Sequence, residues 1–106
     1  MTSTPENQPS TWASLPIAEQ ADAIAAATLA VDGVAALHGG MFGEVGTYLP
    51  GRRVDGVRVD ETGVDVHVSV TEGAPLRKTA RAVKQAVADG MGSTAVTVTV
   101  EDVVPT

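Results

Sequence analysis

The chain has 106 residues, which is enough for one domain with a single modest core. Its net charge of −6 argues against broad nucleic-acid binding, which usually requires a basic surplus. The absence of cysteine excludes disulfides, thiolate catalysis and cysteine-ligated zinc. Because only three residues are aromatic, the core is expected to consist of valine, alanine, isoleucine and leucine.

No basic start precedes an apolar run, so the sequence shows no secretory signal. The most apolar stretch, residues 16–31, contains two acidic residues and is shorter than the roughly 20 residues that a bilayer span needs. We therefore expect a cytoplasmic protein that does not insert directly into a membrane.

Residues 1–13 are rich in small polar residues and proline and are expected to form a disordered tail, followed by a single α+β domain over residues 14–104. Trp12 marks the first point at which the chain can touch the core. Ser14 and Pro16 predict a helix start, because a hydroxyl caps the helix and proline fits its first turn. The apolar positions of this helix follow at helical spacing and are Ile17, Ala21, Ile24, Thr28 and Val31.

Gly33 predicts the end of this helix, and residues 34–37 are expected to form a short buried strand. Residues 38–51 read HGGMFGEVGTYLPG and contain five glycines. Within this run, residues 44–49 are expected to form a short edge strand, and the remainder is expected to be loop.

Residues 57–70 predict a β-hairpin, because valine alternates with polar residues on both sides of residues 60–63. A loop over residues 60–63 places Val59 opposite Val64 and keeps every valine on one face. On the outer face it places Arg58 opposite Asp65, an opposite-charge pair. Val54 is out of phase with this pattern. A one-residue bulge at positions 55–56 would return it to the apolar face, roughly opposite Val68.

Pro75 predicts the start of a second helix, which ends at Gly90 or Gly92. Its expected apolar stripe consists of Leu76, Ala80, Val83 and Val87, with Ala86 beside it. A final strand over residues 95–103 follows. The predicted fold is a two-layer α+β domain, with a small mixed or antiparallel sheet, a central β-hairpin and two helices on one face.

Asp65, His67 and Ser69 include the residue types of a hydrolytic triad, but they alternate along one strand. Neighbours at that spacing lie roughly 6–7 Å apart at the backbone, whereas a triad needs hydrogen-bond contact. The other histidine, His38, lies in no known metal-ligand spacing. We therefore expect no enzyme activity, no catalytic residue, no metal site and no cofactor.

The glycine-rich run is neither a P-loop nor a dinucleotide fingerprint, because its glycines follow a GxxGxxG pattern without a Gly-Lys-Ser/Thr. Residues 40–43 match the GxxG of a KH domain. Met41, Phe42 and Tyr48 add apolar side chains to an otherwise polar segment, which favours a contact surface or a tight structural crossing over a phosphate site.

The second helix carries four of the seven basic residues, which are Arg77, Lys78, Arg81 and Lys84. They form either an ordinary solvated face or a docking face for an acidic partner or an anionic membrane surface.

The sequence resembles actinobacterial members of the alkaline-shock, or general-stress, family of Gram-positive bacteria. The resemblance covers about residues 14–104. Its most specific part is the glycine-rich stretch, residues 33–45 followed by residues 48–54, and it continues in the valine hairpin, in Gly73-Ala74-Pro75 and in the closing strand over residues 96–103.

The resemblance implies a small cytoplasmic, non-catalytic α+β protein linked to cell-envelope stress. Some relatives are held at the membrane by a separate anchoring protein, and some form higher assemblies. We therefore expect a membrane-anchored or family-related protein partner, with homo-oligomer formation left open and no nucleic acid bound. The expected partner-binding residues are Met41, Phe42, Tyr48, Arg77, Lys78, Arg81 and Lys84. The alternatives are a KH-like RNA-binding module that uses the glycine-rich loop and the basic second helix, and a small hydrolase or isomerase around His67.

Overall fold

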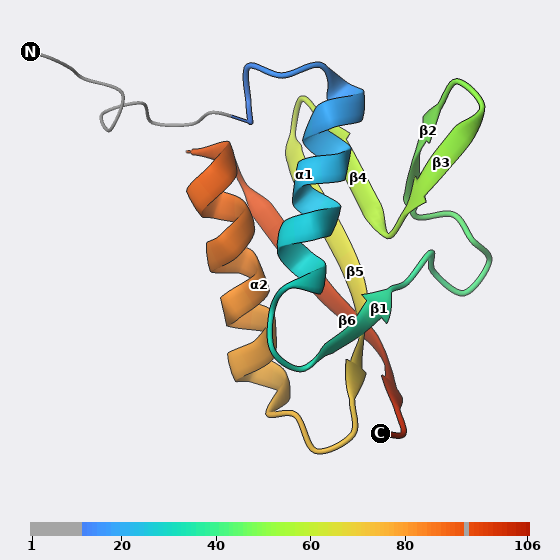
Figure 1. Cartoon of the computed structure of the whole chain (residues 1–106), viewed down its shortest axis with the longest axis vertical. Coiled ribbons are helices and arrows are strands. Elements are labelled where there is room, and N and C mark those ends of the chain that lie inside the picture. The colour runs from blue at the N-terminus through green and yellow to red at the C-terminus, as the bar shows by residue number, and fades with distance from the viewer. Residues whose placement is uncertain (1–11, 93) are drawn as a thin grey trace, which may run out of the picture.

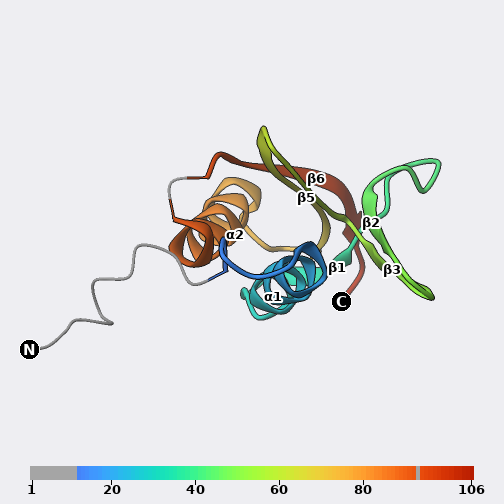
Figure 2. The same ribbon diagram turned by 90° about the horizontal axis from the view of Figure 1, so that it is seen from above.

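Strand β5 (Gly63–Thr71) is the centre of the structure, a computed structural model that describes residues 12–92 and 94–106. Two helices cover one face of the sheet that contains β5 (Figure 2), which confirms the predicted α+β architecture. The other elements are α1 (Ile17–Leu29), β1 (Val34–Leu37), β2 (Gly46–Leu49), β3 (Arg52–Asp55), β4 (Val57–Asp60), α2 (Leu76–Met91) and β6 (Val96–Val104) (Figure 1).

The sheet around β5 is mixed. Strand β6 runs parallel to β5 along one side, while β4 and β1 share the other side and run antiparallel to it. His67 lies where β4 and β1 meet: its N–H donates to the Gly56 carbonyl at 2.8 Å, and its carbonyl accepts the His38 N–H at 2.8 Å. The backbone of β5 is therefore paired along both of its sides.

The predicted hairpin register is confirmed. Val59 lies opposite Val64, and Arg58 lies opposite Asp65. The pairing continues one step further, to Asp60 and Gly63, so the connecting loop is tighter than predicted. Gly63 has a φ of +145°, which a residue with a side chain rarely adopts.

The strand is interrupted at residues 55–56, as predicted, but the strand partner predicted for Val54 is wrong. Gly56 adopts a φ of +78° and turns the chain out of the main sheet. Val54 is buried, at 8% exposure, but it pairs with Thr47 of β2. The place beside Val68 that the bulge would have needed is taken by Leu37 of β1. Strands β2 and β3 therefore form a second, separate hairpin.

The core lies between the valine face of the sheet and the two helices. Its fully buried side chains include Ile24 of α1 and Val83 and Val87 of α2. The stripe predicted for the second helix is displaced, because Leu76 is 46% exposed while Thr79 is buried. The buried face of α2 consists mainly of residues at four-residue spacing, 79, 83, 87 and 91. The first turn of α2 extends beyond the part of the helix that packs on the core.

The start of α1 is fastened differently from the prediction. No side-chain cap is present at its N-terminus, where Pro16 is the capping residue. The buried amide of Gln20 instead donates to the carbonyls of Ala13 and Leu15, at 3.2 and 2.7 Å. Trp12 makes the expected contact with the core, and its backbone N–H donates to the Gly90 carbonyl at 3.1 Å. The rest of the predicted tail, residues 1–11, lies outside the described residues.

Residues 39–45, which we call the glycine loop, connect β1 to β2 and project from the same flank as the β2–β3 hairpin (Figure 1). No described helix is both long enough and apolar enough to span a membrane.

Candidate partner-binding surfaces

The glycine loop is held in shape by its own hydrogen bonds. The Gly40 N–H donates to Nδ1 of His38 at 2.9 Å, and the Gly43 N–H donates to the Gly40 carbonyl at 3.1 Å. The Val45 N–H closes the loop by donating to the Gly39 carbonyl at 2.7 Å. Gly40 and Gly43 both have positive φ values, so these turns depend on glycine.

Two arginines from the neighbouring strands donate hydrogen bonds to the backbone of the loop. The guanidinium of Arg53 donates to the carbonyl of Gly43 and to that of Val45, the latter at 3.0 Å. Arg58 donates to the Glu44 carbonyl at 2.8 Å. Val45 is only 3% exposed and anchors the loop in the interior. The base of the loop is therefore fixed by both polar and apolar contacts.

The carboxylate of Glu44 orders the top of the loop. It accepts the Phe42 N–H at 3.0 Å. Hydrogen bonds from the N–H groups of Glu44 and Phe42 lower the pKa of this carboxyl below its ordinary value. The ionised form therefore holds Phe42 in place at neutral pH.

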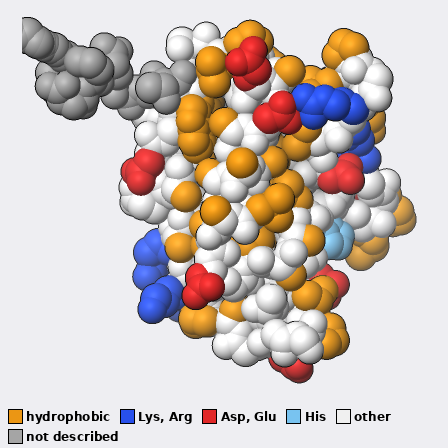
Figure 3. Space-filling model, in the orientation of Figure 1, with side chains coloured by type: hydrophobic (Ala, Val, Ile, Leu, Met, Phe, Trp, Pro, Cys, Tyr) orange, Lys and Arg blue, Asp and Glu red, His pale blue; other side chains and the backbone are white. Residues whose placement is uncertain are grey.

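The loop and the adjoining hairpin present three large apolar side chains to solvent. Phe42 is 87% exposed, Met41 is 81% exposed and Tyr48 of β2 is 74% exposed. The guanidinium of Arg53 lies 4.9 Å from the centre of the Tyr48 ring, which holds that ring by a cation–π contact. Figure 3 shows hydrophobic side chains at the right edge of the molecule, where the glycine loop projects.

The four basic residues predicted on the second helix are all exposed on α2. None of Arg77, Lys78, Arg81 and Lys84 forms an ion pair with another residue in the described part of the chain.

The structure separates the two predicted groups of partner-binding residues. Helix α2 packs against β6, whereas the glycine loop and the β2–β3 hairpin lie beyond β4 and β1, on the opposite flank of the sheet (Figures 1 and 2). In Figure 3 the Lys and Arg side chains likewise gather in two places, one over α2 and one beside the β2–β3 hairpin. Two surfaces are therefore available instead of one.

His67 is paired with a residue that the sequence analysis did not anticipate. Its Nδ1 lies 2.6 Å from Oε2 of Glu101, which comes from β6 and not from the triad pattern on β5. The parallel pairing of β5 with β6, and the irregularity between Val68 and Ser69, bring the two side chains together on the face away from the helices. Among the described residues, no group of three or more His, Asp or Glu side chains is placed to hold a metal ion.

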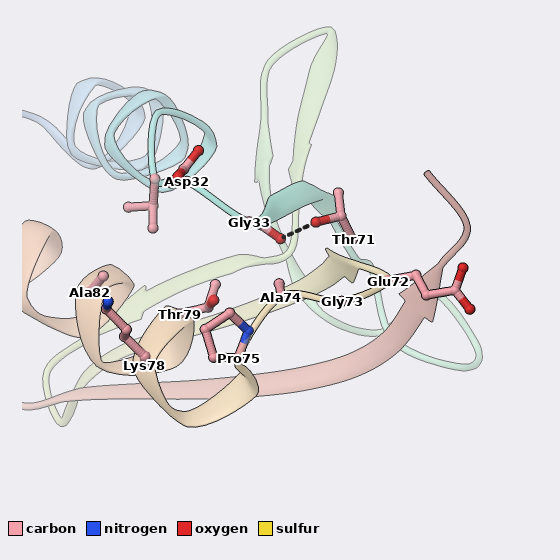
Figure 4. A pocket seen from close by; sticks show the side chains of 11 residues that line it. Asp32, Gly33, Thr71, Glu72, Gly73, Ala74, Pro75, Lys78, Thr79 and Ala82 are labelled. Carbon is pink, nitrogen blue, oxygen red and sulfur yellow. Dashed lines mark hydrogen bonds between the residues drawn. The ribbon is translucent and has the colours of Figure 1, made fainter.

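A hollow of about 510 Å³ lies between the end of α1 and the start of α2 (Figure 4). Its wall includes the hydrogen bond from the Thr71 hydroxyl to the Gly33 carbonyl, at 3.4 Å. Asp32, Glu72 and Lys78 supply its charges, but the carboxylate of Glu72 points away from Lys78. The charged groups of the hollow therefore do not converge on one point.

The GxxG segment, residues 40–43, lies between β1 and β2. The KH-like alternative expects this segment between two helices, so one of its two supporting features, the GxxG match, lacks the required context. Comparison with protein-family models, curated proteins and solved structures found no match for this chain.

The sequence analysis missed the residues that support the loop, above all Arg53, Arg58 and Glu44. One signal was present, because a hairpin turn at Pro50-Gly51 brings Arg53 back beside Tyr48 of the glycine-rich run. The contact of Arg58 with the loop depends on the turn at Gly56 and has no signature in the sequence.

Proposed function

We propose that this protein is a non-catalytic binding protein of the envelope stress response, which docks a protein partner through the glycine loop. The observation that carries the proposal is the exposure of Phe42 and Met41, at 87% and 81%, on a loop that is fastened by hydrogen bonds. Aromatic and methionine side chains are enriched at the centres of interfaces, where burial of one side chain contributes about 1.5–3 kcal/mol.

The order of the loop strengthens this proposal. A flexible loop loses conformational freedom when it binds, and that loss opposes association. Here the carboxylate of Glu44 and the guanidinium of Arg53 already hold the loop in the free protein. Little of the free energy gained by burying Phe42 would therefore be offset by ordering of the loop.

The envelope setting comes from the family resemblance, and localisation is proposed to depend on a membrane-anchored or family-related partner. Stable attachment of a protein to a bilayer needs buried apolar chains or a strong polybasic patch. At a net charge of −6, this chain should not bind vesicles of pure anionic lipid by itself. Sedimentation of the purified protein with such vesicles would contradict this part of the proposal.

The docking proposal is tested by cross-linking and affinity capture from native cells, with three versions of the protein. Phe42→Ala should weaken the affinity for the partner roughly thirtyfold and so reduce its recovery at low and at high salt, since about 2 kcal/mol of apolar burial is lost. Leu29→Ala is the matched control, because Leu29 is 50% exposed on α1, away from the loop. Equal recovery with Phe42→Ala and the unaltered protein would overturn the proposal.

A further inference from the structure

Strand β6 has one edge that no other described strand covers. Strand β5 pairs with the opposite edge, where the Val64 N–H donates to the Ala95 carbonyl at 2.8 Å. Alternate residues of a strand direct their backbone groups to opposite edges. Val96, Val98 and Val100 therefore direct their N–H and C=O groups away from β5, toward the uncovered edge.

Only the first part of this edge, residues 96–100, lacks the usual protection against strand pairing, because Glu101, Asp102 and an irregularity in the pairing follow it. Residues 96–100 read Val-Thr-Val-Thr-Val, without lysine, proline or glycine, and the irregularity in pairing comes only after Val100. Proteins normally interrupt an exposed edge with charge, proline or a bulge, because an uninterrupted one accepts another strand. This stretch of β6 is therefore ready to pair with an added strand.

A groove of about 410 Å³ follows the same edge. On the side of α2 it is lined by Ala80, Arg81 and Lys84. On the side of the sheet it is lined by residues 96–98, three consecutive positions of β6, so it runs along the edge of the strand and not on one face. A strand added to β6 would lie directly beside the two basic side chains.

Within residues 12–92 and 94–106, the basic side chains of α2 form no ion pair or hydrogen bond comparable to those of the other three basic residues. Arg52 pairs with Asp22 at 2.8 Å, and Arg53 and Arg58 hold the glycine loop. Arg77 and Lys78 even lie in the first turn of α2, where the helix dipole disfavours positive charge. The position of Arg77 and Lys78 therefore does not stabilise the helix.

We propose that the β6 edge binds an extended acidic segment of another protein, which adds to the sheet as a further strand. Acidic side chains at every second position of that segment would meet Arg81 and Lys84, while its backbone pairs with Val96, Val98 and Val100. The proposal goes beyond docking by the glycine loop because it concerns the opposite flank. Its failure leaves the role of Phe42 unaffected.

A second copy of the chain fits this edge less well than an acidic segment. Antiparallel pairing of two β6 edges, about a two-fold axis perpendicular to the sheet, would place the α2 helices of both copies on the same face, beside the shared edge. Each helix would bring Arg81 and Lys84 toward the same residues of the other copy. Like charges in that position oppose association, whereas an acidic segment neutralises them.

The test uses the whole protein and a synthetic octapeptide that alternates glutamate and valine. We expect the peptide to slow amide hydrogen exchange at Val96, Val98 and Val100, and to bind more weakly as salt is raised. A lysine–valine peptide and an N-methylated copy of the acidic peptide should both fail, since one has the wrong charge and the other cannot pair its backbone.

The matched variants are Lys84→Glu and Arg52→Glu, which change the net charge equally on opposite flanks of the sheet. Lys84→Glu should weaken binding of the acidic peptide by at least about fivefold, and Arg52→Glu should change it little. The proposal is overturned if no binding is detected up to about 1 mM peptide, or if the N-methylated copy binds equally well. Protection of the same amides in the protein alone, rising with its concentration, would also overturn it and identify a second copy as the occupant.

Discussion

Replacing Gly56 by alanine should destabilise the protein more than the same change at Gly51, a glycine with nearly the same backbone conformation. Gly56 has a φ of +78°, in the left-handed region that costs a residue with a side chain roughly 1–2 kcal/mol. A Cβ at this position would lie 2.8 Å from the His67 carbonyl oxygen and 2.9 Å from the His38 nitrogen. Those two atoms form the 2.8 Å hydrogen bond that joins β1 to β5.

The cost of the left-handed backbone conformation and the cost of the close Cβ contacts add. Carbon atoms pack at roughly 3.5–4.0 Å, so the new Cβ would push the strands apart and weaken one or two backbone hydrogen bonds, at about 1 kcal/mol each. We therefore expect a loss of about 2–4 kcal/mol from the free energy of unfolding. The loss should be larger for Gly56→Val, because its branched side chain adds further contacts.

Gly51→Ala is the matched control. Gly51 has a φ of +76°, nearly the same as Gly56, but a Cβ there meets nothing within 4 Å. It should therefore lose only the backbone contribution of roughly 1–2 kcal/mol. Urea denaturation of the unaltered protein and both variants measures the difference. Equal losses for the two variants, or a loss below about 1 kcal/mol for Gly56→Ala, would refute the reasoning.

Three further predictions concern single side chains. Thr28→Val should raise the free energy of unfolding by about 1 kcal/mol, measured by urea denaturation, because the buried Thr28 hydroxyl has no hydrogen-bond partner among the described residues. Since the pKa of Glu44 is lowered in the folded protein, its stabilisation of the loop is present above the ordinary pKa of a glutamate and is lost as the pH falls through the lowered value. Protection of the Phe42 amide, which is its exchange rate relative to the intrinsic rate at the same pH, should fall over that acidic range. In Glu44→Gln this protection should be lower at neutral pH and should lack the acidic transition. His67→Ala should leave biological activity intact, and a loss of that activity with an unchanged fold would revive a catalytic role for His67.

The sequence was sufficient for the elements whose pattern is local. The alternating valines predicted the β4–β5 register, including Arg58 opposite Asp65, because a slip of one residue would expose the whole apolar face. The same reasoning failed at Val54, where the alternation breaks and the direction of the chain depends on the left-handed turn at Gly56. Whether the strand continues beside Val68 or leaves the sheet depends on which strand occupies that place, and this is a tertiary property.

Of the two candidate surfaces, one was predictable from the sequence and the other was not. Met41, Phe42 and Tyr48 were identified from composition, because apolar side chains within a glycine-rich run have little interior to enter. The uncovered edge of β6 was not identified, since its use depends on the order of strands in the sheet and on the position of α2 beside it. Nor did the residue pattern reveal that the aromatic and basic groups lie on opposite flanks.

The central claim, that Phe42 contacts a protein partner, is tested most directly by photo-cross-linking at that position. A benzoyl-phenylalanine in place of Phe42 preserves the aromatic ring at a site where the side chain is already 87% exposed. The same group in place of Leu29, which is 50% exposed on α1, provides the control. After irradiation of native cells, we predict one discrete adduct from position 42 that position 29 does not give. The same adducts from both positions, or none from position 42, would contradict the claim.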